Sequence, residues 1–185
     1  MCAARVVLAP AMNALLSRLI AICRLRLGPQ DMPYAPATAK ALVVTVLMLE
    51  VVLSQLLDVP DGLLLPRTVL SAVMLVGAPW LLLHLRARSG RLVQTLIALA
   101  GTSLLFTLAL VPLLLLTAAS SVDPAAPAPL VSAAVLLLVV WKLMVNGHIL
   151  RFALDWPPLA AALLALGLFL VELGLDQWLQ GSIAT

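Results

Sequence analysis

The chain is poor in the residues from which most soluble functional sites are built. Of its 185 residues only 10% are charged and 4% are aromatic, and it has two histidines and two cysteines. A soluble domain is typically about one quarter charged. Nucleic-acid binding needs a basic surface interleaved with aromatic side chains, and none is present. We therefore exclude nucleic acid as a partner.

Catalytic and metal-binding motifs are also missing. Cys2 and Cys23 have no metal-site or redox spacing, and His84 and His148 belong to no HxxxH or ExxH pattern. The sequence contains no GxSxG element, P-loop or paired-carboxylate motif. We therefore expect a protein without enzyme activity, without a cofactor and without a metal site.

Long apolar runs dominate what remains. Hydrophobic residues make up 64% of the chain, and its mean hydropathy is +1.17. A bilayer core about 30 Å thick needs roughly 20 apolar residues per helix. The sequence predicts an all-α polytopic membrane helix bundle over residues 39–180, with an interfacial helix before it. The five expected transmembrane helices cover residues 39–57, 68–85, 92–118, 130–150 and 159–178.

The segment before the first span is basic and only partly apolar. Within residues 1–28, the apolar side chains of residues 11–27 fall on one broad face at 100° per residue. This pattern predicts an amphipathic helix on the membrane surface; packing against the cytoplasmic end of the bundle is the alternative. Gly28 and three prolines predict that the helix stops and that residues 29–38 form a Pro-rich linker.

The arginines predict an orientation. Four precede the first expected span, three lie at 86–91 after the second, and Arg151 ends the fourth. Arg67 is the only basic residue in the loops on the other side. Basic loops stay in the cytoplasm, so we expect a cytoplasmic N-terminus and a periplasmic C-terminus. The excess of arginine over lysine and the abundant alanine and leucine suggest a bacterial gene, and hence the inner membrane.

Two ionisable residues are expected deep in the bilayer. Counting 1.5 Å per residue, Glu50 lies about 15 Å and Lys142 about 13 Å from the cytoplasmic side. Charges at such depth need partners, so we predict a contact between them. It is either a structural ion pair or part of a proton or ion pathway with His148. Glu172, at about 20 Å, is a poorer match and is expected near the outer interface.

One loop resembles a known family. Residues 84–91, HLRARSGR, run into Gln94–Ala98 and the later Val111-Pro112, with Trp141 in the fourth span. Together with five spans, this is similar to bacterial members of the Yip1 domain family. The resemblance implies a non-enzymatic integral membrane protein. The second glycine of that loop and the Asp-Leu-x-Gly-Pro motif of eukaryotic members are absent, and no binding residue or trafficking role is transferred.

Two functions follow from these patterns. The first is a scaffold, assembly factor or membrane-organising component that binds other membrane proteins through Pro29–Pro36 and the N-terminal helix. The second is a small transporter or channel subunit that uses Glu50, Lys142 and His148. Because five short helices enclose little volume, a transporter is expected to form a homo-oligomer. A third class, a lipid-modifying enzyme, would need a polar cavity that opens to the bilayer.

Overall fold

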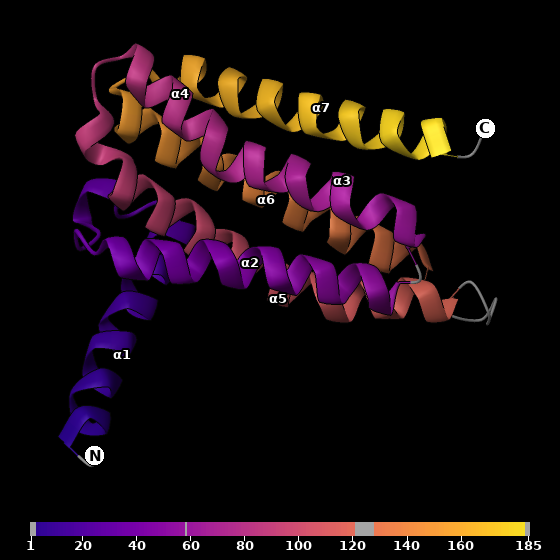
Figure 1. Cartoon of the computed structure of the whole chain (residues 1–185), viewed down its shortest axis with the longest axis horizontal. Coiled ribbons are helices and arrows are strands. Elements are labelled where there is room, and N and C mark those ends of the chain that lie inside the picture. The colour runs from indigo at the N-terminus through magenta and orange to yellow at the C-terminus, as the bar shows by residue number, and fades with distance from the viewer. Residues whose placement is uncertain (1–2, 58, 121–127, 184–185) are drawn as a thin grey trace.

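The chain folds into five long apolar helical spans and a shorter N-terminal helix (Figure 1). The computed structural model describes residues 3–57, 59–120 and 128–183. The α-helices are α1 (Ala3–Cys23), α2 (Pro36–Leu56), α3 (Asp61–Ala72), α4 (Ala78–Leu85), α5 (Leu92–Ser120), α6 (Ala128–Leu154) and α7 (Pro158–Ile183). Short 3₁₀ turns, η1 and η3, cover Pro29–Asp31 and Ser89–Arg91. The predicted all-α membrane bundle is confirmed.

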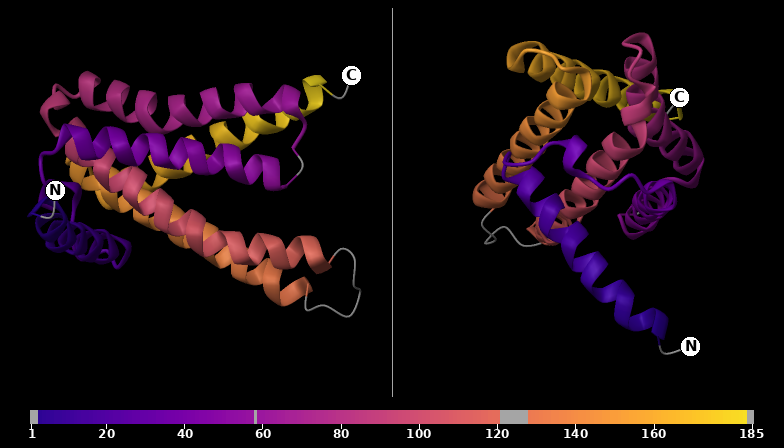
Figure 2. Two further views of the ribbon diagram at one scale, coloured as in Figure 1. Left: turned by 60° about the horizontal axis from the view of Figure 1, so that its bottom comes forward. Right: turned by 90° about the vertical axis from the view of Figure 1, so that its left-hand side faces the viewer.

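The spans form a closed ring. Helix α2 packs against α5, α5 against α6, α6 against α7, α7 against α3, and α3 returns to α2. At the end where α1 lies, all five spans are close together (Figure 2). At the opposite end the hairpin of α5 and α6 diverges from α2 and α3, as the left view shows. The ring is therefore narrow at one end and wider at the other.

The core is concentrated at the narrow end. One cluster of buried side chains joins α1, the linker, α5 and α6 there, with Ile97, Val145 and Ile149 fully buried. A second cluster of Leu83, Ala153 and Leu154 closes the ring between α4 and α6. Buried apolar side chains exclude water most effectively where they pack densely. Packed apolar side chains consequently close the bundle at the α1 end.

The second span is longer and less regular than predicted. It begins at Asp61 and not at Thr68, because Pro60 directly precedes the helix and Asp61 lies in its first turn, where a carboxylate is favourable. Its middle is a π-helical turn, η2 (Val73–Gly77), in which the Ala78 amide donates to the Val73 carbonyl. Pro79 follows at once. A π-turn ahead of a proline absorbs the kink that the missing amide donor causes.

The N-terminal segment is bound to the narrow end of the bundle. Helix α1 runs transverse to the spans (Figure 1) and buries Leu19 and Ile22 against the core. In the linker Met32 is buried, and its carbonyl accepts a 2.8 Å hydrogen bond from Gln94. Met12, further from the bundle, is 68% exposed. The last turns of α1 therefore pack on the bundle, whereas the Met12 side chain faces the surroundings.

At this end of the bundle, the basic loop after α4 is bound to the loop between α6 and α7, which contains Asp155. Asp155, at a positive φ of 50°, accepts hydrogen bonds from both Arg88 and Arg91. Arg91 also donates to the Phe152 carbonyl at 3.0 Å, and the Arg86 guanidinium lies 5.0 Å from the Trp156 ring centre. These contacts fix the turn after α4 to the turn between α6 and α7.

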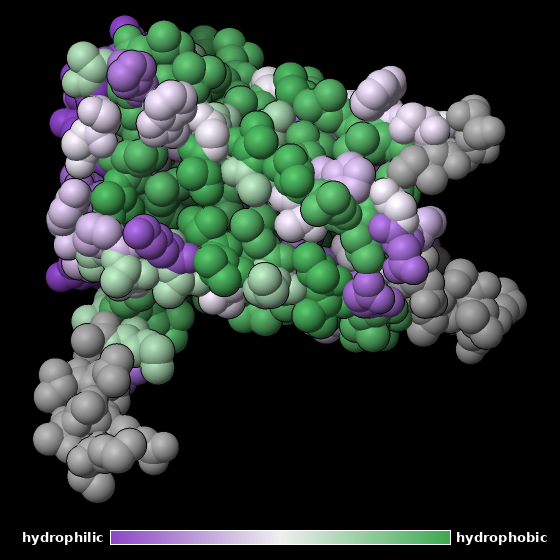
Figure 3. All heavy atoms as spheres, viewed as in Figure 1, coloured by the Kyte–Doolittle hydropathy of each residue, from purple (hydrophilic) through white to green (hydrophobic). Residues whose placement is uncertain are grey.

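The outer surface is apolar across its middle. In Figure 3 hydrophobic side chains cover the centre of the visible face, and hydrophilic ones gather at the two ends of the bundle. Exposed aliphatic residues on α2 and α6 include Val44, Met48, Val52, Leu136 and Leu137. Such a band matches the hydrocarbon layer of a bilayer. The chain is a multi-pass membrane protein whose spans contact lipid.

Candidate functional site

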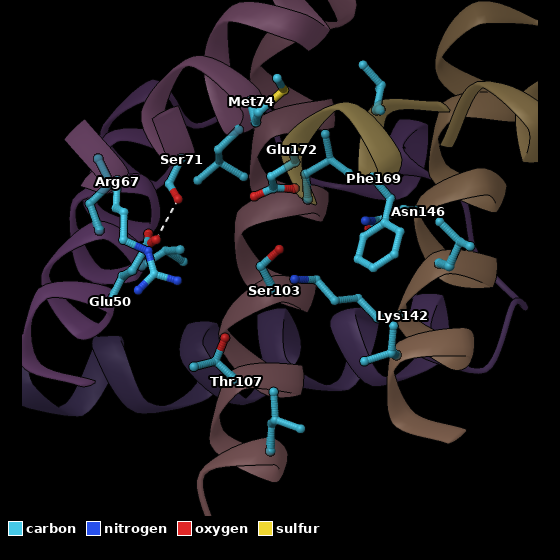
Figure 4. A pocket seen from close by; sticks show the side chains of 18 of the residues that line it. Glu50, Arg67, Ser71, Met74, Ser103, Thr107, Lys142, Asn146, Phe169 and Glu172 are labelled. Atoms are coloured by element: carbon cyan, nitrogen blue, oxygen red, sulfur yellow. Dashed lines mark hydrogen bonds between the residues drawn. The ribbon is translucent and has the colours of Figure 1, made fainter. Parts of the chain in front are cut away.

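A cavity with several polar and charged side chains in a mainly apolar lining lies between the spans. Its volume is about 490 Å³, within the roughly 300–1,000 Å³ of small-ligand pockets. The cavity is partly open to the surroundings, and Lys142 in its lining is exposed. The lining comes from all five spans (Figure 4). Its ionisable side chains are Glu50, Arg67, Lys142 and Glu172, and its neutral polar ones are Ser54, Ser71, Ser103, Thr107 and Asn146.

Glu50 on α2 is anchored to the second span. The hydroxyl of Ser71 donates a 2.5 Å hydrogen bond to the Glu50 Oε1 atom. A hydrogen bond to a charged acceptor is stronger than one between neutral groups. This bond therefore helps to hold α2 against α3 and turns the carboxyl group toward the cavity.

Arg67 forms an ion pair with Asp176 on α7. Its Nε lies 2.6 Å from Asp176 Oδ1, and its Nη2 donates to Oδ2 at 3.0 Å. The two bonds form the planar, two-pronged geometry in which arginine binds carboxylates best. The sequence did not predict this ion pair, because residues 58–67, with Arg67 among them, were expected to form a turn and Asp176 was given no role. The spacing of Glu172 and Asp176, four residues apart on one helix face, was the available signal.

Several lining groups have no hydrogen-bond or ion-pair partner among the described residues. In the described part of the chain, the Lys142 ammonium and the Glu172 carboxyl form no hydrogen bond and no ion pair within 4 Å. The same ranges give no hydrogen bond for the side chains of Ser103, Thr107 and Asn146. Lys142 points toward Ser103 across the cavity (Figure 4). These groups are available to bind water or a ligand.

The predicted Glu50–Lys142 contact is only partly reproduced. Both residues line the same cavity and interact electrostatically, but no ion pair forms between them within 4 Å. Glu50 binds Ser71 instead. Glu172, which we expected near the outer interface, faces the cavity and also interacts electrostatically with Lys142. Helix rise led us to expect Glu50 and Lys142 at similar heights, and they share one cavity; the direction of a side chain depends on how its helix packs.

His148 lies apart from the cavity. Its Nε2 atom is 3.0 Å from the Leu27 carbonyl oxygen, and its ring meets Phe152 edge-on with centres 4.9 Å apart. Two turns earlier, Trp141 Nε1 donates to the Cys23 carbonyl at 2.9 Å. These residues of α6 hold the end of α1 and the start of the linker in place. Their geometry gives His148 a role in docking the N-terminal segment.

The described residues contain no cluster of metal-ligating side chains. Among the residues that the structure describes, no group of three or more histidine, cysteine, aspartate or glutamate side chains could hold an ion. The fold and its apolar surface define the class of protein: a five-span helical membrane protein with a charged internal cavity.

No family model, curated protein or solved structure matches the chain. The resemblance to the Yip1 domain family stays a prediction.

Proposed function

We propose that the protein is a small membrane transporter that binds a polar solute in its internal cavity. The observation that carries this proposal is the set of polar lining groups, Lys142 and Glu172 foremost, that have no partner among the described residues. A polar group without a partner in hydrocarbon costs several kcal/mol. Water or a polar solute in the cavity removes that cost.

The asymmetry of the bundle supports a carrier more than an open channel. Apolar clusters seal the α1 end, whereas the spans diverge at the other end (Figure 2). Such a shape corresponds to a site accessible from one side at a time. With the arginine-rich α1 end in the cytoplasm of a bacterial inner membrane, as the distribution of arginines favours, this conformation faces outward. The π-turn before Pro79, beside the cavity, is a natural point of bending.

A scaffold role has less support from the geometry. The Pro29–Pro36 segment, which we regarded as its contact surface, buries Pro29 and Met32 against the bundle. The rest of that segment, Tyr34 included, stays largely exposed. The proposed transport is non-enzymatic and requires no cofactor, because binding and release of a solute change no covalent bond. Assembly into a homo-oligomer remains part of the proposal.

Thiol accessibility tests the proposal. In a variant in which Cys2 and Cys23 are replaced by alanine, we add Ser103→Cys and treat membrane vesicles of each orientation with a charged, membrane-impermeant methanethiosulfonate. We expect labelling from both faces, because a carrier alternates between two openings. The matched control is Thr102→Cys on the same helix, where the native side chain is 1% exposed and hydrogen-bonds to the Ala98 carbonyl; it should stay unlabelled.

Asn146→Cys on α6 provides a second probe of the same cavity, so a folding defect at position 103 does not leave the test without an answer. Labelling of both positions from one face only would contradict transport. An absence of labelling at both positions in folded protein would contradict a hydrated cavity altogether.

A further inference from the structure

The inference concerns the ligand, and it rests on the proposed function. The cavity's four ionisable side chains divide into two pairs. Glu50 and Arg67 are engaged, the first by Ser71 at 2.5 Å and the second by Asp176 at 2.6 Å. Lys142 and Glu172 form no hydrogen bond and no ion pair within 4 Å with any described residue. The groups left for a ligand thus comprise one cation and one carboxyl group.

These two free groups come from adjacent helices. Lys142 projects from α6 and Glu172 from α7, which pack side by side. Figure 4 shows both entering the same space, with the carboxyl of Glu172 and the ammonium of Lys142 on different sides of it. They interact electrostatically yet stay more than 4 Å apart. A molecule placed between them would meet a positive group on one side and a negative group on the other.

Neutral donors surround the lysine. Asn146 follows Lys142 by one helical turn on α6, and Ser103 and Thr107 face it from α5. Amide and hydroxyl donors beside an ammonium suit an anionic oxygen group such as a phosphate or carboxylate. Glu172, by contrast, offers only acceptors when ionised, which suits an ammonium. The two halves of the cavity therefore prefer opposite charges.

We propose that the ligand is a zwitterion that carries an ammonium and a phosphate or carboxylate, bound by Glu172 and Lys142 respectively. A zwitterion compensates both free charges at once, so that no net charge is brought into the membrane. A simple anion or cation would leave one of them unpaired, which is costly in a medium of low dielectric constant. The ligand could be a free solute or the headgroup of a zwitterionic phospholipid.

Three soluble probes test this charge requirement on the purified full-length protein. Glycerophosphoethanolamine carries both charges, glycerol 3-phosphate only the negative one, and ethanolamine only the positive one. Apparent affinities come from the shift of the thermal midpoint with probe concentration. We expect wild-type protein to bind the zwitterion about tenfold or more tightly than either other probe, as one additional charge-assisted hydrogen bond would give.

Two variants assign the roles. Glu172→Gln should remove the advantage of the zwitterion over glycerol 3-phosphate but keep its advantage over ethanolamine. Lys142→Met should remove the advantage of the zwitterion over ethanolamine but keep its advantage over glycerol 3-phosphate. The matched control is Lys40→Met, because Lys40 does not line the cavity and the chain has no further lysine; all three affinities should stay unchanged. A wild-type protein that binds glycerol 3-phosphate or ethanolamine as tightly as the zwitterion would overturn the proposal.

A lipid arm distinguishes the two sources. Nanodiscs of phosphatidylethanolamine or phosphatidylglycerol are analysed by native mass spectrometry for lipid retained by the protein. Retention of phosphatidylethanolamine that is lost in Glu172→Gln would identify a lipid headgroup, whereas binding of the soluble probe alone would identify a free solute. If neither the soluble zwitterion nor phosphatidylethanolamine binds while Ser103→Cys is labelled, the proposal of a zwitterionic ligand is wrong, but the cavity is hydrated. If Ser103→Cys and Asn146→Cys are both unlabelled, the proposed function itself fails.

Discussion

Replacing Asp176 by asparagine should destabilise the protein more than the same change at any exposed aspartate. The substitution leaves the Arg67 guanidinium without its carboxylate partner on α7. Loss of one partner from a fully buried ion pair costs roughly 3–5 kcal/mol. Because these side chains are still 29% and 21% exposed, we expect about 2 kcal/mol. Reversible unfolding in mixed micelles measures the difference.

The control and the rescue separate charge from packing. Asp155→Asn makes the same chemical change in a more exposed ion pair (49% exposed), and should cost no more than about 1 kcal/mol. A double variant, Arg67→Met with Asp176→Leu, should recover most of the stability because it removes both charges together. Equal stability of Asp176→Asn and wild type would show that the pair does not join α3 to α7.

Replacing Gly147 by leucine should separate α6 from α7. A Cβ atom at this position would lie 3.3 Å from the Ala162 Cα and 3.7 Å from the Ala161 carbonyl oxygen. Small residues allow helices in membranes to approach closely in this way. The backbone of α7 cannot rotate aside as a side chain can, so we expect a loss of about 1–3 kcal/mol. Thermal unfolding followed by circular dichroism measures it.

Gly167 on α7 provides the matched control. No atom lies within 4 Å of a Cβ built there, so Gly167→Leu should be neutral or slightly stabilising, because glycine is a poor helix former. Similar losses at the two positions would mean that the close approach of α6 and α7 is not the cause. Since Lys142 and Glu172 lie on these two helices, Gly147→Leu should also weaken ligand binding.

The sequence was sufficient for the architecture because a membrane span is a property of consecutive residues. Apolar runs of about 20 residues predicted the five spans, and helix rise placed Glu50 and Lys142 at one depth, where they do share a cavity. The start of the second span was predicted too late, because prolines, a glycine and acids in residues 58–67 also suit a turn. The helix that forms there instead carries Arg67.

Contacts between spans could not be derived in the same way. The partnership of Arg67 with Asp176 joins residues 109 positions apart, and it depends on which helices are neighbours and which faces they turn to each other. The same uncertainty placed Glu172 near the interface and left His148 as a possible member of the alternative pathway. In the structure Glu172 lines the cavity, and His148 binds the Leu27 carbonyl. Depth is encoded locally, whereas side-chain direction is set by the packing of the whole bundle.

Whether Lys142 faces a hydrated cavity within the membrane can be measured directly, because the chain has only two lysines, Lys40 and Lys142. Protein labelled with ¹⁵N at the lysine Nζ atoms gives two side-chain signals in bilayers, and Lys142→Met assigns them. Water-edited solid-state NMR then measures transfer of magnetisation from water to each ammonium. We expect comparable transfer to Lys142 and to the exposed Lys40. Transfer to Lys40 alone would contradict the account.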